Sequence, residues 1–197
     1  MTDFAVLAGS TITNTGPTTV AGNVGVHPGS AITGFPPGTV VDGAIHSADT
    51  VCAQAQADAA TLYDDLAGRR DSVELTGLDL GGLRLPPGVY RFGSSAQLTG
   101  TLTLDARGDD EATFVFQIGS TLTTASASHV ALTNGGRVHN VFWLVGSSAT
   151  LGTGTHLLGR IVALTSITAT TGVRVTGQLV ARHGAVTLDS NVIRLCD

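Results

Sequence analysis

Residues 141–191 read VFWLVGSSATLGTGTHLLGRIVALTSITATTGVRVTGQLVARHGAVTLDSN, and this stretch decides the fold class. Apolar runs open at Val141, Ile161 and Gln178, which are 20 and 17 residues apart. Each run is followed by a strand of small residues, then a glycine-containing turn, then a third short strand. Three short strands per repeat of this length are typical of a β-solenoid, in which each coil stacks on its neighbour. The sequence therefore predicts a mainly β solenoid that forms a single domain over residues 1–197.

The repeat continues on the N-terminal side of this stretch. A fourth apolar run, FVFQIG, begins at Phe114, 27 residues before Val141, and residues 124–140 lengthen that interval. The first strand of each repeat is apolar at nearly every position. Such a strand is buried on both sides, so we expect another element to cover this face of the solenoid.

One segment, over about residues 47–67, is predicted to be a helix. Ser47 is a suitable N-cap, alanine is frequent, and Gly68 can end the helix. Apolar residues recur at helical spacing on one face, at Val51, Ala55, Leu62 and Leu66. This helix is the expected cover for the apolar first strands.

The second strands carry the pattern that points to function. In each, one apolar residue is expected to point inward: Ile12, Ile32, Leu98, Leu122, Leu151, Ile167 and Val186. Because side chains alternate along a strand, the two neighbours of each point outward. The outward set is Thr11, Thr13, Ala31, Thr33, Gln97, Thr99, Thr121, Thr123, Thr150, Gly152, Ser166, Thr168, Ala185 and Thr187. None of these residues is charged.

The β-propensity of threonine explains threonine on any exposed strand. It does not explain why Lys, Arg, Asp and Glu are missing from a whole solvent-facing surface. The third strands differ, since their outward positions are expected to include His129, His156, Arg174 and Asn191. We therefore interpret the second-strand surface as a functional one. Stacked coils would place its methyl and hydroxyl groups on a grid of about 4.8 Å by about 6.7 Å, a spacing suited to ordered, ice-like water.

The composition excludes several classes of function. Charged residues make up 13% of the chain, the net charge is −5, and all ten basic residues are arginine. Nucleic-acid binding needs a basic patch, so we expect no nucleic-acid partner. No apolar run reaches the length of a membrane span, and the mean hydropathy of +0.28 is too high for intrinsic disorder. Crystalline polysaccharide is a weaker alternative, because aromatics make up 5% of residues and the aligned face carries none.

No pattern points to catalysis or to a cofactor. The six histidines lack the tight spacing of metal ligands, and the carboxylates at 64–65 and 109–111 fit a solvated helix face and a polar loop. We therefore expect no enzyme activity, no metal and no cofactor. Cys52 and Cys196 match no redox or metal motif. Either they form one disulfide, which would suit an oxidising compartment, or they are two free thiols.

Six stretches closely resemble the microbial ice-binding protein family, and together they cover essentially the whole chain. They are FAVLAGSTITNTG from Phe4, GNVGVHPGSAITGFPPG from Gly22, FVFQIGSTLTT from Phe114, VFWLVGSSATLGTGT from Val141, GRIVALTSIT from Gly159 and GAVTLDSN from Gly184. The resemblance implies a right-handed, roughly triangular solenoid that is discontinuous in chain order, with one long helix alongside. It also implies an ice-binding surface made of one flat face and adjoining loops, without catalytic residues or cofactor.

The family often carries a Thr–Ala/Gly–any–Thr/Asn loop motif beside that face. The stretches that resemble it begin at Thr124, Thr153 and Thr171, and all three depart from it at the fourth position, where two carry His156 and Arg174. The predicted ice-binding residues are therefore the outward set without Gln97, together with Thr153. We expect a secreted or cell-surface monomer whose partner is ice, with thermal hysteresis and recrystallisation inhibition as activities. The alternative is an adhesive or structural solenoid with weak or lost ice affinity.

Overall fold

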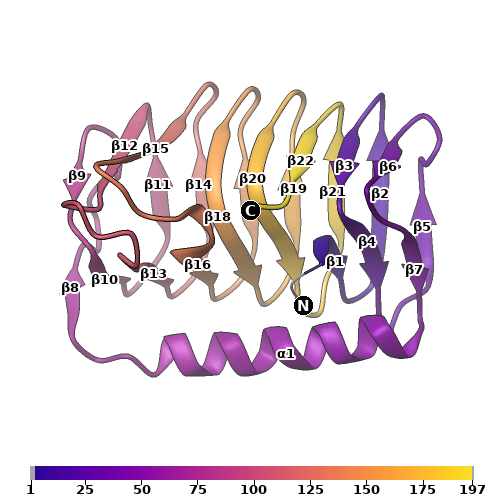
Figure 1. Cartoon of the computed structure of the whole chain (residues 1–197), viewed down its shortest axis with the longest axis horizontal. Helices are drawn as coiled ribbons and strands as arrows, with labels where there is room; N and C mark the ends of the chain where they lie inside the picture. Colours follow the sequence, from indigo (N-terminus) through magenta and orange to yellow (C-terminus); the bar gives the residue numbers. More distant parts are fainter. Residues whose placement is uncertain (1–2, 197) are drawn as a thin grey trace.

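The protein is a parallel β-solenoid with a single long helix lying along it (Figure 1). The computed structural model describes residues 3–196. The coils stack along the longest axis, and α1 (Thr50–Ala67) runs parallel to that axis beneath them. Every strand pairing is parallel. No helix in the described part of the chain is long and apolar enough to cross a membrane. The mainly β solenoid and its covering helix are confirmed.

The seven second strands form one sheet, which we call the threonine sheet. Its spatial order is β11 (Ala96–Leu98), β14 (Leu122–Thr124), β17 (Ala149–Leu151), β19 (Ile167–Ala169), β21 (Val186–Asp189), β2 (Thr11–Thr15) and β5 (Ala31–Thr33).

A second sheet of 15 strands covers the other two faces of the solenoid. The helix-side face consists of β8 (Ser72–Glu74), β10 (Gly88–Phe92), β13 (Phe114–Ile118), β16 (Val141–Val145), β1 (Phe4–Ala8), β4 (Asn23–Val26), β7 (Ile45–Ser47) and the C-terminal halves of β18 (His156–Ala163) and β20 (Arg174–Ala181). The third face consists of the N-terminal halves of β18 and β20 with β9 (Arg84–Leu85), β12 (Thr101–Asp105), β15 (His129–Thr133), β22 (Val192–Arg194), β3 (Thr19–Ala21) and β6 (Thr39–Val41). The 3₁₀ turn η1 (Val138–Asn140) precedes β16.

Two glycines form the corner at which β18 and β20 pass from the third face to the helix side. Gly159 and Gly177 are register partners, with φ of 103° and 145°. A Cβ atom on Gly177 would lie 1.8 Å from the carbonyl oxygen of Gly159. The corner therefore needs glycine both for its backbone conformation and for the close approach of the two chains.

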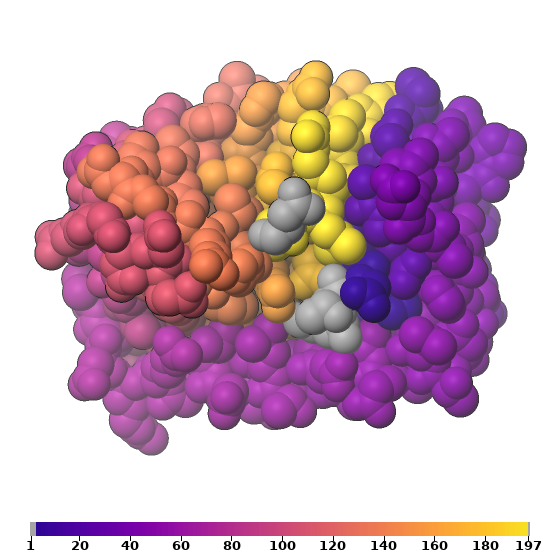
Figure 2. Space-filling model, viewed as in Figure 1, coloured from indigo at the N-terminus to yellow at the C-terminus, as the bar shows by residue number. Residues whose placement is uncertain are grey.

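The order of coils in space differs from their order in the chain. The C-terminal strands pair with the N-terminal ones, as in Val6 beside Leu179 and Thr13 beside Thr187. Figure 2 shows the last coils directly beside the first. From this seam the N-terminal coils run to one end of the solenoid, and α1 carries the chain to the other end, at β8. The predicted discontinuity in chain order is confirmed.

The solenoid interior is packed with apolar side chains from all three faces. Tyr90, Phe116 and Trp143 are register partners on adjacent coils, and their rings stack at centroid distances of 5.4 and 4.1 Å. The indole Nε1 of Trp143 donates to the carbonyl oxygen of Leu158 at 2.9 Å. The buried indole N–H of Trp143 therefore has a hydrogen-bond partner, and this bond links the helix-side face to the third face.

The helix covers the apolar first strands, as predicted, but its details differ. It begins later than expected, because the side chain of Asp49, rather than that of Ser47, accepts from the backbone N–H of Cys52. Ser47 ends strand β7 instead. The buried helix face comprises Cys52, Ala55, Ala59 and Leu66, with Leu62 partly buried beside them. Val51 is 51% exposed, so its predicted place on that face is wrong.

The two cysteines are separate free thiols in the structure. Cys52 is fully buried between α1 and the helix-side face, and Cys196 is half-buried at the C-terminal end of the described chain. Burial raises the pKa of the Cys52 thiol to about 11, so this thiol stays protonated at neutral pH.

Candidate functional site

The outward side chains of the threonine sheet form two straight rows that cross the stacked coils. The row we call the threonine row begins with Gln97 and continues through Thr123, Thr150, Thr168, Thr187, Thr13 and Thr33, one residue per strand. Two residues earlier on each coil lies the row we call the mixed row, formed by Ser95, Thr121, Ser148, Ser166, Ala185, Thr11 and Ala31. Neither row contains a charged residue.

The two rows are continuous because the strand registers run without interruption across the sheet. Each threonine of the threonine row is the direct register partner of the next, from β14 to β5. The alternate side chains point into the core, and Leu122, Ile167 and Val186 among them are buried. A packed interior beneath an unbroken ladder holds the outward Cβ atoms at fixed spacings of about 4.8 Å between coils.

The rows differ in exposure. Thr123, Thr150, Thr187, Thr13 and Thr33 are exposed, and only Thr168 of these threonines is half-buried. In the mixed row Ser95 and Ala31, at the two ends, are exposed, whereas the five residues between them are half-buried. Gln97 sits at the end of the threonine row, where its Nε2 donates to Thr99 Oγ1 at 3.2 Å. It therefore bounds the row and does not interrupt it.

The predicted alignment of two coils is shifted by two residues. Ala96 pairs with Leu122, and Ala149 pairs with Ile167, so Leu98 and Leu151 lie one inward position further along. Thr99 and Gly152 consequently fall outside both rows. Ser95 and Ser148 take their place in the mixed row, although the pattern of the second strands did not single them out. All other members of the predicted outward set, apart from the loop residue Thr153, lie in the two rows.

Two of the three loop stretches stack on one another, and the third does not. Thr153 and Thr171 are both exposed, and the N–H of Gly154 donates to the carbonyl oxygen of Thr171 at 3.0 Å. Thr124 is buried and its hydroxyl hydrogen bonds with that of Thr155 at 2.7 Å, so the stretch at Thr124 is out of register with that at Thr153. Thr153 itself is exposed in the turn after β17 and lies 3.4 Å from the hydroxyl of Thr170.

The third-strand expectations are met in part. His129, His156 and Arg174 are exposed register partners in one row of the third face. Asn191 was expected to point outward as well, but it is fully buried. Its Nδ2 donates to the carbonyl oxygen of Thr170 at 2.7 Å, so it closes a turn inside the solenoid.

Charged and titratable groups collect on the third face. The imidazoles of His129 and His156 have ring centroids 5.5 Å apart. Partial burial, and then the neighbouring His129 and Arg174, lower the pKa of His156 below its usual value. Asp105 accepts from Asn134, from the backbone N–H of Arg107 and from Arg84, and these bonds lower its pKa to about 2. No three His, Cys, Asp or Glu side chains between residues 3 and 196 come together as a metal site.

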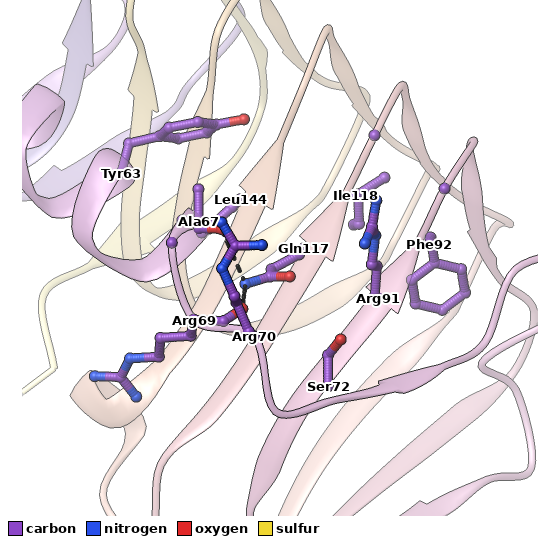
Figure 3. A pocket seen from close by; sticks show the side chains of 13 residues that line it. Tyr63, Ala67, Arg69, Arg70, Ser72, Arg91, Phe92, Gln117, Ile118 and Leu144 are labelled. Carbon is purple, nitrogen blue, oxygen red and sulfur yellow. Dashed lines mark hydrogen bonds between the residues drawn. The ribbon is translucent and has the colours of Figure 1, made fainter.

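A polar cavity of about 450 Å³ lies beside the C-terminal end of α1 (Figure 3). Gln117 lies beneath the helix end, and its Nε2 donates to the carbonyl oxygens of Leu66 and Arg69 at 2.8 and 2.9 Å. The last helical carbonyls have no partner inside the helix, so Gln117 supplies one from the sheet. The polar groups at this cavity thus join α1 to the solenoid.

This parallel solenoid with its covering helix is a fold that solved ice-binding proteins share. The Ice-binding-like family model matches residues 6–194, and the chain belongs to this family. An ice-binding protein of Nostoc sp. (strain HG1) is 60% identical over 192 residues, which cover 97% of this chain and 71% of that relative.

Solved structures agree with this assignment. An ice-binding protein from an Antarctic biological consortium superposes with a TM-score of 0.96 at 45% identity, covering 100% of this chain and 89% of the other. The ice-binding protein of the Antarctic ascomycete Antarctomyces psychrotrophicus gives a TM-score of 0.95 at 42% identity, with 100% and 96% coverage.

Proposed function

We propose that this protein adsorbs to ice through the outward surface of the threonine sheet, with the threonine row at its centre. The observation that supports this most strongly is the row itself, in which six threonines on six adjacent strands stand in direct register with no charge among them. At about 4.8 Å per coil the six span about 24 Å.

The chemistry of the row suits a layer of ordered water. Each threonine presents a methyl group, which binds water weakly, beside a hydroxyl group, which holds water at a fixed place. Charged side chains would organise their own hydration shells and disturb such a layer, and the two rows contain none. A rigid sheet keeps the groups in place before ice is met, so little conformational entropy is lost on adsorption.

Adsorption of this kind predicts two activities, thermal hysteresis and inhibition of ice recrystallisation. We propose that the protein meets ice outside the cell and works there as a single chain that needs no cofactor and catalyses no reaction. The polar, uncharged face needs no protein partner to cover it.

The test is ice-affinity partitioning, in which a dilute solution freezes slowly onto a cold finger and the ice fraction is assayed. We expect the parent protein to concentrate in the ice and Thr150→Tyr/Thr168→Tyr to stay in the liquid, because the two rings hold the sheet away from the lattice. The matched control is Thr101→Tyr, which places the same ring at an exposed position of the third face. If the parent stays in the liquid, the adhesive or structural alternative is correct. If the control loses as much partitioning as the double variant, the wrong face is assigned.

A further inference from the structure

We propose that the two rows of the threonine sheet have different roles. The threonine row contacts the ice-ordered water, and the mixed row fastens the edges of adjacent coils to one another. This inference rests on the proposed function and divides its surface into contact residues and positioning residues.

Four of the five hydroxyls in the mixed row, those of Ser95, Thr121, Ser148 and Ser166, make hydrogen bonds within the protein. Ser148 Oγ accepts from the backbone N–H of Ser166 at 3.3 Å, and Ser166 Oγ accepts from that of Ala185 at 3.2 Å. At the far end of the sheet, Thr121 Oγ1 donates to Ser95 Oγ at 2.8 Å. These bonds link successive coils along the row.

The bonds fill a gap in the backbone ladder. The ladder proper begins one residue later, where the N–H of Ala149 donates to the carbonyl oxygen of Ser166 and the N–H of Ile167 to that of Ala185, both at 2.9 Å. Within residues 3–196 the amide groups of Ser166 and Ala185 have serine oxygens, and no carbonyl oxygen, as their acceptors. The serine side chain thus extends the ladder to the corner where each coil enters the sheet.

The threonine row shows the opposite behaviour. None of its six threonine hydroxyls makes a hydrogen bond to another residue of the described chain. All but Thr168 are exposed, whereas the serines at the centre of the mixed row are half-buried. Hydroxyls that are exposed and unpaired within the protein are the ones free to hold water.

Two double variants on the same two coils separate the roles. Ser148→Ala/Ser166→Ala removes the two serine acceptors, and Thr150→Ala/Thr168→Ala removes two threonines that lie two residues further on. The rates of amide hydrogen exchange at positions 166 and 185 measure how firmly adjacent coils are held together. Thermal hysteresis reports the contact with ice.

We expect the serine variant to exchange about three- to tenfold faster at these amides, the equivalent of one lost hydrogen bond, while it keeps more than half of its hysteresis. We expect the threonine variant to keep the parent exchange rates and to lose most of its hysteresis. Ser148→Thr/Ser166→Thr retains both acceptor oxygens and should restore slow exchange.

Three results would overturn the division of roles. These are unchanged exchange in the serine variant, a loss of hysteresis in it as large as in the threonine variant, or fast exchange in the Ser→Thr variant. If neither alanine variant loses hysteresis while the parent still partitions into ice, the threonine sheet is not the ice-binding surface and the proposed function itself fails.

Discussion

The threonine sheet and the third face are built from the same coils, yet they present different chemistry to solvent. Both are parallel ladders with one residue per coil in each outward row. The threonine row shows six identical side chains in succession. The third face shows, in one row, Thr101, His129, His156, Arg174, Val192, Thr19 and Thr39.

Regular stacking alone therefore does not make a regular surface. The backbone of a solenoid supplies the spacing on every face, and the side chains decide whether the spacing reaches the solvent. Side chains as long as those of histidine and arginine sample many rotamers and carry charge, so the third face loses its repeat a few ångströms above the backbone. Short, branched threonine has few rotamers and preserves the repeat.

We expect the largest loss of activity when a charge is introduced into the threonine row by a side chain of similar size. We expect Thr150→Asp to lose most of the thermal hysteresis, because a carboxylate imposes its own hydration. Thr150→Asn has nearly the same size without the charge and should keep clearly more activity. Both variants should lose about 1 kcal/mol or less of stability, the range of β-propensity. Equal hysteresis in the two variants would show that charge is not what the row excludes.

The next test compares the cores beneath the two faces on a single coil. Leu151 points inward from the threonine sheet and Leu157 from the third face, and both are buried. Each change to alanine should cost about 2–5 kcal/mol in the free energy of unfolding, measured by denaturant titration. Well below the melting temperature, hysteresis should fall further for Leu151→Ala, because its cavity lies on the inner side of the threonine sheet, next to Thr150 of the threonine row. An equal fall for both would mean that the faces are not mechanically independent.

A pH series should change the third face and leave the threonine sheet unaffected. The pKa of His156 is lowered in the folded protein, so the unfolded chain takes up a proton at higher pH than the folded one. Stability should therefore fall as the pH drops below about 6.5, the ordinary histidine pKa. Melting temperatures at pH 7.5 and 5.5 measure this, and His156→Gln should show a smaller difference. Hysteresis over the same range should stay constant, and a pH-dependent hysteresis would contradict the assignment of the ice-binding face.

A substitution at the edge of the third face should have almost no effect on hysteresis. Arg174→Thr restores the family-like Thr–Gly–any–Thr spacing from Thr171, yet Arg174 belongs to the third face, beside His156. We expect hysteresis equal to that of the parent within error. An increase would show that the ice-binding surface extends around the corner from the threonine sheet to the third face.

The solenoid, its covering helix and most of the threonine surface could be predicted from the sequence. Apolar runs repeat at coil length, and strand alternation then assigns inward and outward residues without knowledge of the fold. The helix start was misplaced because Ser47 and Asp49 are both good N-caps, and pairing of β7 with β4 extends the strand through Ser47. That pairing leaves Asp49 as the first residue free to cap.

The register error has a different cause. A shift of two residues leaves every side chain on its original face, so alternation cannot detect it. In β11 and β17 the inward pair is a small residue followed by a large one, Ala96 with Leu98 and Ala149 with Leu151. An alignment on the larger residue chooses the wrong member. The stacking of neighbouring coils places the alanine, and not the leucine, in register with the inward residue of the next coil. The sequence of one coil does not contain this information.

The seam at which β20–β22 meet β1–β3 has a consequence for how the chain is made. A repeat array whose coils follow chain order can lengthen its folded part coil by coil during synthesis. Here the N-terminal coils are synthesised first, but the neighbour that covers one side of them is the last coil. Translation order and stacking order therefore conflict, and the first coils keep an open edge until the C-terminal residues have left the ribosome. Closure of such distant pairs is a slow event, so we infer that it is the seam that sets the pace of folding.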